Sequence, residues 1–292
     1  MDPDQTVFLT GGTGVVGRAV AERFARDGVG VHLLVRKESR KGARAWLSAL
    51  RERERDAADR VRLLTGDLLR PLDDDVQERV RVDCAGVVHC ASERRPDADR
   101  EHTFELNIEA TRRMLALGKE LGGPMLHVSD LRVHGDRTGV AFESDLLAGQ
   151  GFPNAAAESR MLAERHAVAA MAKQPVTILR LAHPRVASID PTRRPDPLAS
   201  PRRPALAERL RARFEAPRFA HVLPVEFLAD VVLAAWRDES CRGQTLHVAD
   251  PFAPTARELL GGALPSGPLP GEGVRLDTTA FDGLLRRSGL GR

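Results

Sequence analysis

Apolar residues along the chain alternate between short continuous runs and longer stretches with helical spacing. The short runs are typical of buried strands and cover residues 5–9, 29–35, 61–65, 86–90, 125–129 and 176–181. Helical spacing follows the first five of these runs, over residues 15–27, 41–58, 73–81, 97–121 and 154–173. Strands that alternate with helices in this way predict an α/β fold with a doubly wound parallel sheet.

A glycine-rich loop, Thr-Gly-Gly-Thr-Gly-Val-Val-Gly over residues 10–17, joins the first predicted strand to the first predicted helix. Its glycines allow a tight turn, close approach of the backbone to a pyrophosphate, and close packing of helix on strand. The amino end of the helix adds unpaired N–H groups and a partial positive charge. The unit is typical of a Rossmann fold and predicts dinucleotide contacts from Thr10, Gly11, Thr13, Gly14, Val15, Val16 and Gly17.

The end of the second predicted strand bears on the choice of cofactor. Arg36 lies there, about 20 residues past the loop, where chains that bind NAD tend to place Asp or Glu for the ribose 2′-hydroxyl. An arginine suits a 2′-phosphate instead, and Lys37 and Arg40 add positive charge beside it. The sequence therefore favours NADPH as the cofactor, with NADH as the alternative.

After residue 182 the alternation becomes less regular. Residues 183–204 are rich in Pro, Arg, Ser and Asp and predict a loop or lid. Helices are expected over 205–215, 225–236 and 279–286 and a strand over 244–248, with a Gly/Pro stretch at 261–273. We expect residues 1–182 to form the Rossmann domain and residues 183–292 a small substrate-binding cap, with 225–250 returning to the Rossmann core.

Composition indicates a cytoplasmic enzyme that acts on a small molecule. The 292 residues carry a formal net charge of +3, from 44 basic and 41 acidic side chains, so no strong field favours nucleic acid. Neither a secretory leader nor an apolar run of membrane-spanning length is recognisable. Cys84, Cys90 and Cys241 lack metal or disulfide spacing. We expect no metal, nucleic-acid or membrane partner; the oligomeric state is left open.

Four further segments carry motifs in a familiar order: Gly66-Asp67-Leu68, Val88-His89-Cys90-Ala91-Ser92, Asn107-Ile108-Glu109-Ala110-Thr111, and residues 224–230 with the sequence Pro-Val-Glu-Phe-Leu-Ala-Asp. With the glycine loop, they resemble the extended short-chain dehydrogenases/reductases of the epimerase/dehydratase and thioester-reductase-like group, over about residues 5–250. Ala110 and Phe227 replace the usual Gly and Tyr of these motifs. The resemblance implies that Asp67 contacts adenine, and that cofactor contacts also come from Leu68, Cys90, Ala91, Ser92 and Asn107.

The catalytic positions depart from this family, because the chain contains no tyrosine. The segment Val128-Ser129-Asp130-Leu131-Arg132-Val133-His134-Gly135 matches the family's Val-Ser-Ser-x-x-Val-Tyr-Gly, which puts Asp130 at the catalytic Ser/Thr position and Ser129 one residue earlier. On the next helix, the Tyr-x-x-x-Lys positions hold Ala156 and Arg160. The resemblance thus implies a lost Ser-Tyr-Lys triad.

The replacements change the chemistry that is available. Ala156 cannot donate a proton, and Arg160 can hold ribose hydroxyls but cannot relay one. Ionised Asp130 would repel a developing alkoxide unless burial kept it protonated; alternatively, Asp130 and Arg160 form an ion pair that fills the old site. His127, His134 and His183 lie near strand ends and are possible acids. Candidate catalytic residues are therefore Ser129, Asp130, Arg160 and His183.

Three functions fit these residues. The first is an NAD(P)H-dependent ketoreductase whose substrate, an aromatic ketone beside a phenol, stabilises its own alkoxide through an internal hydrogen bond. Here the chain resembles the tyrosine-less ketoreductases of angucyclinone antibiotic pathways, among them that of simocyclinone biosynthesis. The second is a non-redox isomerase, cyclase or dehydratase with Asp130 as base. The third is a nucleotide-sensing regulator without catalysis.

Overall fold

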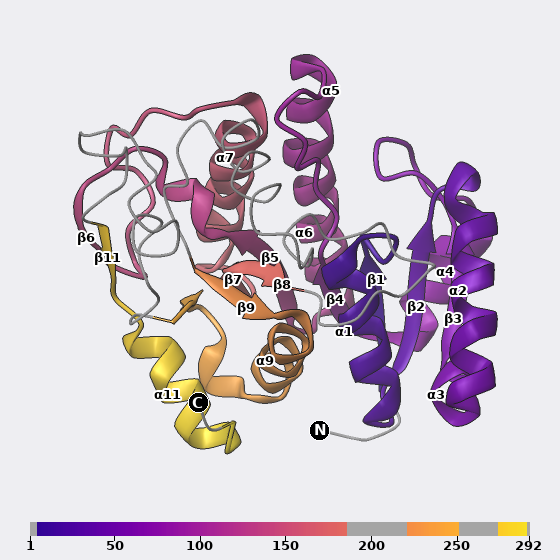
Figure 1. Ribbon diagram of the computed structural model, residues 1–292. Helices are drawn as coiled ribbons and strands as arrows, with labels where there is room; N and C mark the ends of the chain where they lie inside the picture. The colour runs from indigo at the N-terminus through magenta and orange to yellow at the C-terminus, as the bar shows by residue number, and fades with distance from the viewer. Residues whose placement is uncertain (1–4, 186–220, 251–273, 291–292) are drawn as a thin grey trace, which may run out of the picture.

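A seven-stranded parallel sheet forms the centre of the molecule (Figure 1). The computed structural model describes residues 5–185, 221–250 and 274–290. The strand order is β10-β7-β5-β4-β1-β2-β3. The strands are β1 (Thr6–Thr10), β2 (Gly30–Val35), β3 (Val61–Thr65), β4 (Cys84–His89), β5 (Met125–Asp130), β7 (Val176–Leu181) and β10 (Thr245–Val248). The predicted α/β fold with a doubly wound parallel sheet is confirmed.

Helices cover both faces of this sheet (Figure 1). One face is covered by α1 (Val15–Arg26), α2 (Arg40–Arg53), α3 (Arg55–Asp59), α9 (Val225–Arg237) and α11 (Thr279–Ser288). The other is covered by α4 (Asp74–Asp83), α6 (Ala110–Leu121) and α7 (Ala155–Ala170), with the short α5 (Arg100–Phe104) against α7.

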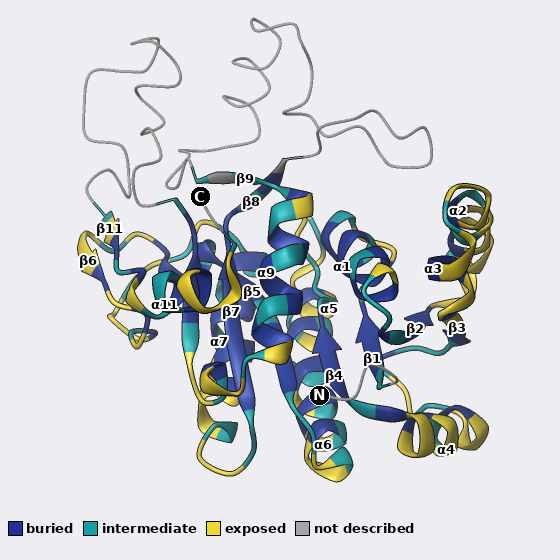
Figure 2. Ribbon diagram, turned by 90° about the horizontal axis from the view of Figure 1, so that it is seen from below, coloured by how far each residue is buried: buried dark blue, intermediate teal, exposed yellow. Residues whose placement is uncertain are grey.

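The two-residue period of the strands divides the core between these two layers. In β1, Val7 and Leu9 belong to the cluster under α1 and α9, whereas Phe8 belongs to the cluster under α4 and α6. The strands are accordingly buried on both faces, and the outer faces of α2 and α4 are exposed (Figure 2). Burial on both faces explains why the strands read as continuous apolar runs in the sequence.

Two predicted helices are interrupted. The helix expected over 41–58 breaks at Glu54, whose backbone is extended (φ −149°, ψ 78°). The helix expected over 97–121 consists of α5, a π-helical turn over Glu105–Glu109, and α6. The turn carries Asn107, whose side chain makes long-range contacts that local spacing does not reveal.

Four short strands were not predicted. β6 (Gly139–Ala141) pairs with β11 (Val274–Leu276), and β8 (His183–Arg185) pairs with β9 (Val222–Pro224). Each is three residues long and depends on a distant partner, so no periodic pattern marks it. The helix predicted over 205–215, most of the predicted lid and the stretch 261–273 lie outside the described residues.

The segment after residue 220 returns to the sheet. β10 pairs with β7, and α9 packs along α1, where the rings of Trp236 and Phe24 lie 6.0 Å apart. A separate cap over residues 183–292 stays a prediction. Within the three described ranges, every helix is too short or too polar to cross a bilayer.

Candidate cofactor site and catalytic strand end

The glycine loop, residues 10–17, is shaped by close packing of backbone on backbone. Gly11 has φ +78°, and a Cβ there would lie 2.5 Å from backbone atoms of Cys90 and Ala91 at the end of β4. A Cβ on Gly17 would lie 2.3 Å from the carbonyl oxygen of Gly11. Only glycine permits both approaches. The loop is thereby fixed between β4 and the first turn of α1.

The start of α1 is the open part of this loop. Thr13 and Gly14 are exposed and Val15 is half-buried, whereas Thr10, Val16 and Gly17 are buried. The Thr10 hydroxyl lies 2.7 Å from Nδ1 of His89, which fixes it inside the core. Unpaired N–H groups at an exposed helix start are suited to a pyrophosphate. Direct contacts are therefore expected from residues 13–15, with the buried members of the loop shaping it.

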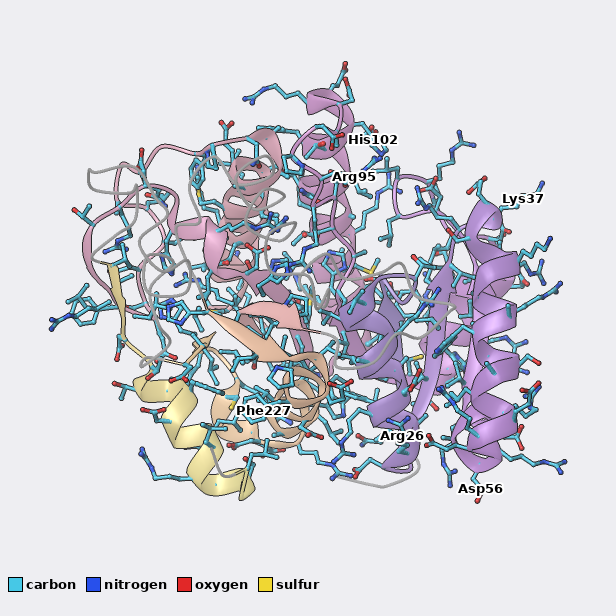
Figure 3. All side chains as sticks on the ribbon, viewed as in Figure 1. Arg26, Lys37, Asp56, Arg95, His102 and Phe227 are labelled. Atoms are coloured by element: carbon cyan, nitrogen blue, oxygen red, sulfur yellow. The ribbon has the colours of Figure 1, made fainter. Side chains whose placement is uncertain are left out.

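Two cations follow β2. Arg36 and Lys37 are exposed, and the part of the chain that the structure describes offers neither an ion-pair partner within 4.0 Å. Figure 3 shows the Lys37 side chain at one end of α2. Both side chains remain available to a phosphate near the carboxyl end of β2. Their assignment to a 2′-phosphate stays a prediction.

The segment after β3 has two different roles. Asp67 is half-buried and accepts a hydrogen bond of 2.9 Å from the Leu69 N–H, which shapes the turn. Leu68 is buried and packs into the core under α4 and α6. A cofactor contact by Leu68 is therefore limited to its backbone. The second carboxylate oxygen of Asp67 accepts no hydrogen bond from the described residues.

The end of β4 borders the glycine loop on its other side. The Cys90 N–H donates to the Thr10 carbonyl at 3.2 Å, and Cys90, Ala91 and Ser92 are all half-buried. Asn107 then holds the following turn: its Oδ1 accepts from the Glu93 N–H at 2.7 Å, and its Nδ2 donates to the Ser159 hydroxyl at 2.8 Å. Asn107 is 2% exposed, so it positions the β4 turn against α7 rather than facing a ligand.

The hydroxyl of Ser129 points away from the predicted catalytic position. It donates a 2.6 Å hydrogen bond to Glu164 on α7, and both side chains are buried. Glu164 also accepts from Arg180 Nε at 2.8 Å. Ser129 is thus the end of a buried polar chain rather than a substrate-orienting hydroxyl.

Asp130 is surrounded by three guanidinium groups. Arg132 donates to its carboxylate at 2.8 Å, Arg94 lies 3.6 Å from it, and Arg160 forms a close ion pair with it. The ion pair between Asp130 and Arg160 that the sequence allowed is therefore present. Adjacent cations stabilise the ionised carboxylate, so Asp130 is a poor proton donor here.

Ala156, which the family resemblance assigns to the tyrosine position, is fully buried in α7. One turn further along α7, Arg160 is 3% exposed, and its Nε has no hydrogen-bond partner among the described residues. The helix thus brings a cation, but no acid–base group, beside the end of β5.

The three candidate histidines are not brought together at this point. His134 is fully buried, its Nε2 lies 2.8 Å from that of His247, and burial lowers its pKa to about 2. Burial also lowers the pKa of His127 to about 4. His183 is half-buried in β8, and its N–H donates to the His221 carbonyl. β5 and the turn after it bury both rings, so His127 and His134 are packed histidines rather than acids that face an open site.

A buried polar chain continues from Glu164 and was missed by sequence reasoning. Arg180 NH1 lies 2.8 Å from His247 Nε2, and the His247 N–H donates to Glu143 at 2.8 Å. Glu143 also accepts from the Ala280 N–H at 2.6 Å, at the start of α11. Charged residues inside strands, such as Arg180 within the apolar run of β7, are the one sequence signal that could have revealed it.

The residues fit a dinucleotide, because the glycine loop leaves no room for a Cβ at Gly11 or Gly17 and opens at the start of α1. A metal has no comparable site: within the described ranges, no three His, Cys, Asp or Glu side chains are grouped as ligands.

Solved structures with the same fold span nearly the whole chain. The terminal R domain from the myxalamid PKS-NRPS biosynthetic pathway has a TM-score of 0.74 at 22% identity, and the likeness covers 98% of this chain and 74% of that one. Yeast methylglyoxal/isovaleraldehyde reductase, complexed with NADPH, has a TM-score of 0.68 at 15% identity, over 97% of this chain and 93% of that one. Both show the same fold as this chain.

Curated relatives include the fatty acyl-CoA reductase wat of Drosophila melanogaster, which is 25% identical over 218 residues, or 61% of this chain and 42% of that protein. The chain spans less than half the length of the curated relatives it matches. Residues 9–232 match the NAD-binding family described as "Male sterility protein". Since this match covers most of the 292 residues and includes the glycine loop, the β4 turn and the end of β5, the chain belongs to that family.

Proposed function

We propose that this protein is an NADPH-dependent ketoreductase that reduces a carbonyl of an aromatic, angucyclinone-like polyketide in antibiotic biosynthesis. In this proposal the substrate supplies the hydrogen bond that a catalytic tyrosine gives in related enzymes. NADPH, when bound, supplies the hydride. The protein's own task is to hold the two reactants in the orientation for transfer.

The observation that carries the proposal concerns the described residues at the end of β5, where none of the three positions that match the family's catalytic segments offers a proton donor. Ala156 replaces the tyrosine, the hydroxyl of Ser129 is committed to Glu164, and Asp130 is paired with arginines. A site without its own acid suits a ketone that already carries an internal hydrogen bond from an adjacent phenol. The alkoxide formed on reduction is then paired from the start.

The cofactor assignment rests on the residues around the carboxyl ends of β1 and β2. The exposed start of α1 suits the pyrophosphate, although the Gly14 N–H already donates to the Gly11 carbonyl at 3.0 Å. Arg36 and Lys37 suit a 2′-phosphate, which NADPH has and NADH lacks. Arg160 lies on the far side of the loop, at the nicotinamide end; because it is 3% exposed and paired with Asp130, it can bind the ribose hydroxyls only if that ion pair opens.

The relatives support a reductase of this kind. A curated relative is a fatty acyl-CoA reductase, and one solved relative in fold is the terminal R domain from the myxalamid PKS-NRPS biosynthetic pathway. Another solved relative carries NADPH. Two of these three proteins are named as reductases, and an aromatic ketone beside a phenol is a substrate that suits a reductase site without a tyrosine.

The test compares two substrates that differ by one methyl group. An aromatic ketone with a neighbouring phenol is expected to oxidise NADPH, and its phenol methyl ether is expected to react at least about 100-fold more slowly, because its alkoxide stays unpaired. Absorbance of the reduced nicotinamide gives both rates. Deuterium at the transferable position of NADPH is expected in the alcohol product.

Two variants separate this function from its alternatives. Ser129→Ala is expected to keep substantial turnover, since its hydroxyl contacts Glu164 rather than substrate. If Asp130→Asn abolishes product formation while no deuterium enters the product, the ketoreductase proposal fails. That result would favour an isomerase, cyclase or dehydratase with Asp130 as base. Cofactor binding with no turnover of any ketone would favour a nucleotide-sensing regulator.

A further inference from the structure

Positive charge exceeds negative charge at the end of β5. Arg94, Arg132 and Arg160 surround the single carboxylate of Asp130; we call these four residues the arginine cluster. The nearby Glu93 balances them only in part: its charge also acts on Arg160, but its carboxylate pairs with Arg95 at 2.9 Å and accepts from the Arg95 N–H. Three guanidinium groups against one carboxylate leave a local surplus of positive charge.

Hydrogen-bond donors also exceed acceptors in the arginine cluster. Three guanidinium groups carry about fifteen N–H donors, whereas one carboxylate offers about four acceptor sites. Asp130 accepts hydrogen bonds from the Arg132 side chain and N–H, and it forms ion pairs with Arg160 and, at 3.6 Å, with Arg94. Arg160 is 3% exposed, yet its Nε has no hydrogen-bond partner in the described residues. A buried donor without a partner is costly, so the cluster is incomplete without a further acceptor.

The cluster is open on one side. The side chains of Arg94 and Arg132 are 41% and 36% exposed, whereas those of Arg160 and Asp130 are 4% and 7% exposed. Solvent therefore reaches the two outer guanidinium groups while the inner ion pair stays covered. Burial, and after it the charge of Arg94, lower the pKa of Arg160 well below that of a free guanidinium, and a bound anion would oppose this shift.

The position of the cluster favours a substrate group over a cofactor phosphate. The strand order β2-β1-β4-β5 places Arg36 at one side of the glycine loop and the cluster at the other. A dinucleotide with its adenosine phosphate near β2 and its pyrophosphate at the loop has its nicotinamide end toward β4 and β5. The cluster then lies beside the reacting end, beyond both phosphate positions.

We propose that the arginine cluster is an anion subsite that binds a phenolate or carboxylate oxygen of the substrate through Arg94 and Arg132, over the buried Arg160. That the bound anion belongs to a substrate rests on the proposed ketoreductase function. Anion binding at the cluster itself does not require turnover. Bidentate guanidinium groups are suited to such oxygens. An acidic phenol beside the ketone would then be bound by the arginines, in addition to its internal hydrogen bond with the ketone oxygen.

The experiment measures anion binding without catalysis. Salicylate, and salicylamide as its neutral counterpart, are titrated calorimetrically into the protein saturated with NADP⁺. Salicylate is expected to bind at least about tenfold more tightly than salicylamide, and Arg94→Ala and Arg132→Ala are each expected to weaken salicylate about tenfold or more. Arg95→Ala is the matched control, because Arg95 is adjacent in sequence and pairs with Glu93 outside the cluster. It is expected to leave salicylate binding unchanged.

Removing the carboxylate gives a prediction of opposite sign. Asp130→Asn deletes the anion that competes for the arginines, so salicylate is expected to bind more tightly than in the wild type. Weaker binding in this folded variant contradicts the proposal. Equal affinity for salicylate and salicylamide, or equal losses in Arg94→Ala and Arg95→Ala, would also overturn it.

Two further outcomes separate the anion subsite from the proposed function. If Arg94→Ala weakens NADPH while salicylate binding is unchanged, the cluster contacts a cofactor phosphate and the subsite is refuted. If salicylate binds as expected but no ketone is reduced, the subsite stands and the ketoreductase proposal fails. If ketones are reduced and the arginine variants change neither KM nor salicylate affinity, only the subsite fails.

Discussion

The two ends of the dinucleotide site are built by different physical means. At the glycine loop, backbone lies against backbone, and the decisive feature is the absence of a Cβ at Gly11 and Gly17. At the end of β5, charged side chains lie against one another, and Asp130, Glu164 and Arg180 are all buried. The first region follows its family's pattern closely, whereas the second departs from it.

The difference between the glycine loop and the end of β5 indicates where substitutions are tolerated in this fold. A loop fixed by steric contact has few alternatives, since a larger residue at Gly11 collides with the end of β4. A polar site can exchange one set of charges for another, provided that each buried charge keeps a partner. Ala156, at the position that the resemblance assigns to the tyrosine, is buried in the core, and Asp130 and Arg160 form an ion pair beside it.

The largest effect on the free energy of unfolding is expected from a substitution that breaks the buried polar chain. Arg180→Met leaves the fully buried Glu164 without its cation and is expected to lower the free energy of unfolding by about 3–5 kcal/mol. Urea unfolding at neutral pH measures this loss. Arg180→Met combined with Glu164→Met is expected to recover much of it. In the control, Arg81→Met removes a half-exposed ion pair with Glu120 and is expected to cost less than about 1 kcal/mol; equal losses at both sites would contradict the comparison.

The next effect concerns the glycine loop. Gly11→Ala forces a non-glycine residue to φ +78° and a Cβ to within 2.5 Å of the β4 backbone. We expect a loss of about 2–4 kcal/mol in the free energy of unfolding, together with weaker cofactor binding. Gly42→Ala is the control, because its Cβ meets nothing within 4 Å in α2, and it is expected to stabilise by up to about 1 kcal/mol. A Gly11→Ala variant as stable as Gly42→Ala would refute the steric account.

A smaller effect is the pH dependence that Glu143 contributes. Burial raises its pKa to about 7 in the folded protein, from an ordinary value near 4.5. The folded state therefore binds the extra proton, and this contribution to stability is present below about pH 4.5 and is lost as pH rises through 7. Relative to Glu143→Gln, the wild type is expected to lose about 1–2 kcal/mol between pH 5 and 7.5. Urea midpoints of both proteins across this range test it, and parallel curves would show that Glu143 titrates normally.

The smallest effect sharpens the assignment of the cofactor. Arg36→Ala is expected to weaken NADPH by about tenfold and to leave NADH almost unchanged, because only NADPH presents a 2′-phosphate to the guanidinium. Dissociation constants from cofactor fluorescence measure both. Arg51→Ala, on the same side of the sheet but paired with Asp59, is the control. Equal losses for both cofactors would exclude Arg36 as the residue that selects NADPH.

Much of the fold was predictable because its signals are local. The apolar runs of β1 to β5 and β7 and the spacing of α1 and α9 mark their elements within a residue or two. Breaks within helices were not predictable, since Glu54 and the π-helical turn around Asn107 depend on contacts with other segments. The paired short strands depend on partners more than 35 residues away and leave no periodic pattern.

By itself the sequence determined the dinucleotide loop, the parallel sheet and the loss of the tyrosine, because backbone sterics and apolar periodicity act over neighbouring residues. Only the tertiary structure decided that Ser129 faces Glu164, that His134 is buried against His247, and that Asp130 pairs with arginines from three segments. These outcomes depend on which charged and polar groups meet when the chain is packed. The partners of these ion pairs and hydrogen bonds lie far apart in the sequence, and no local pattern indicates which groups will meet.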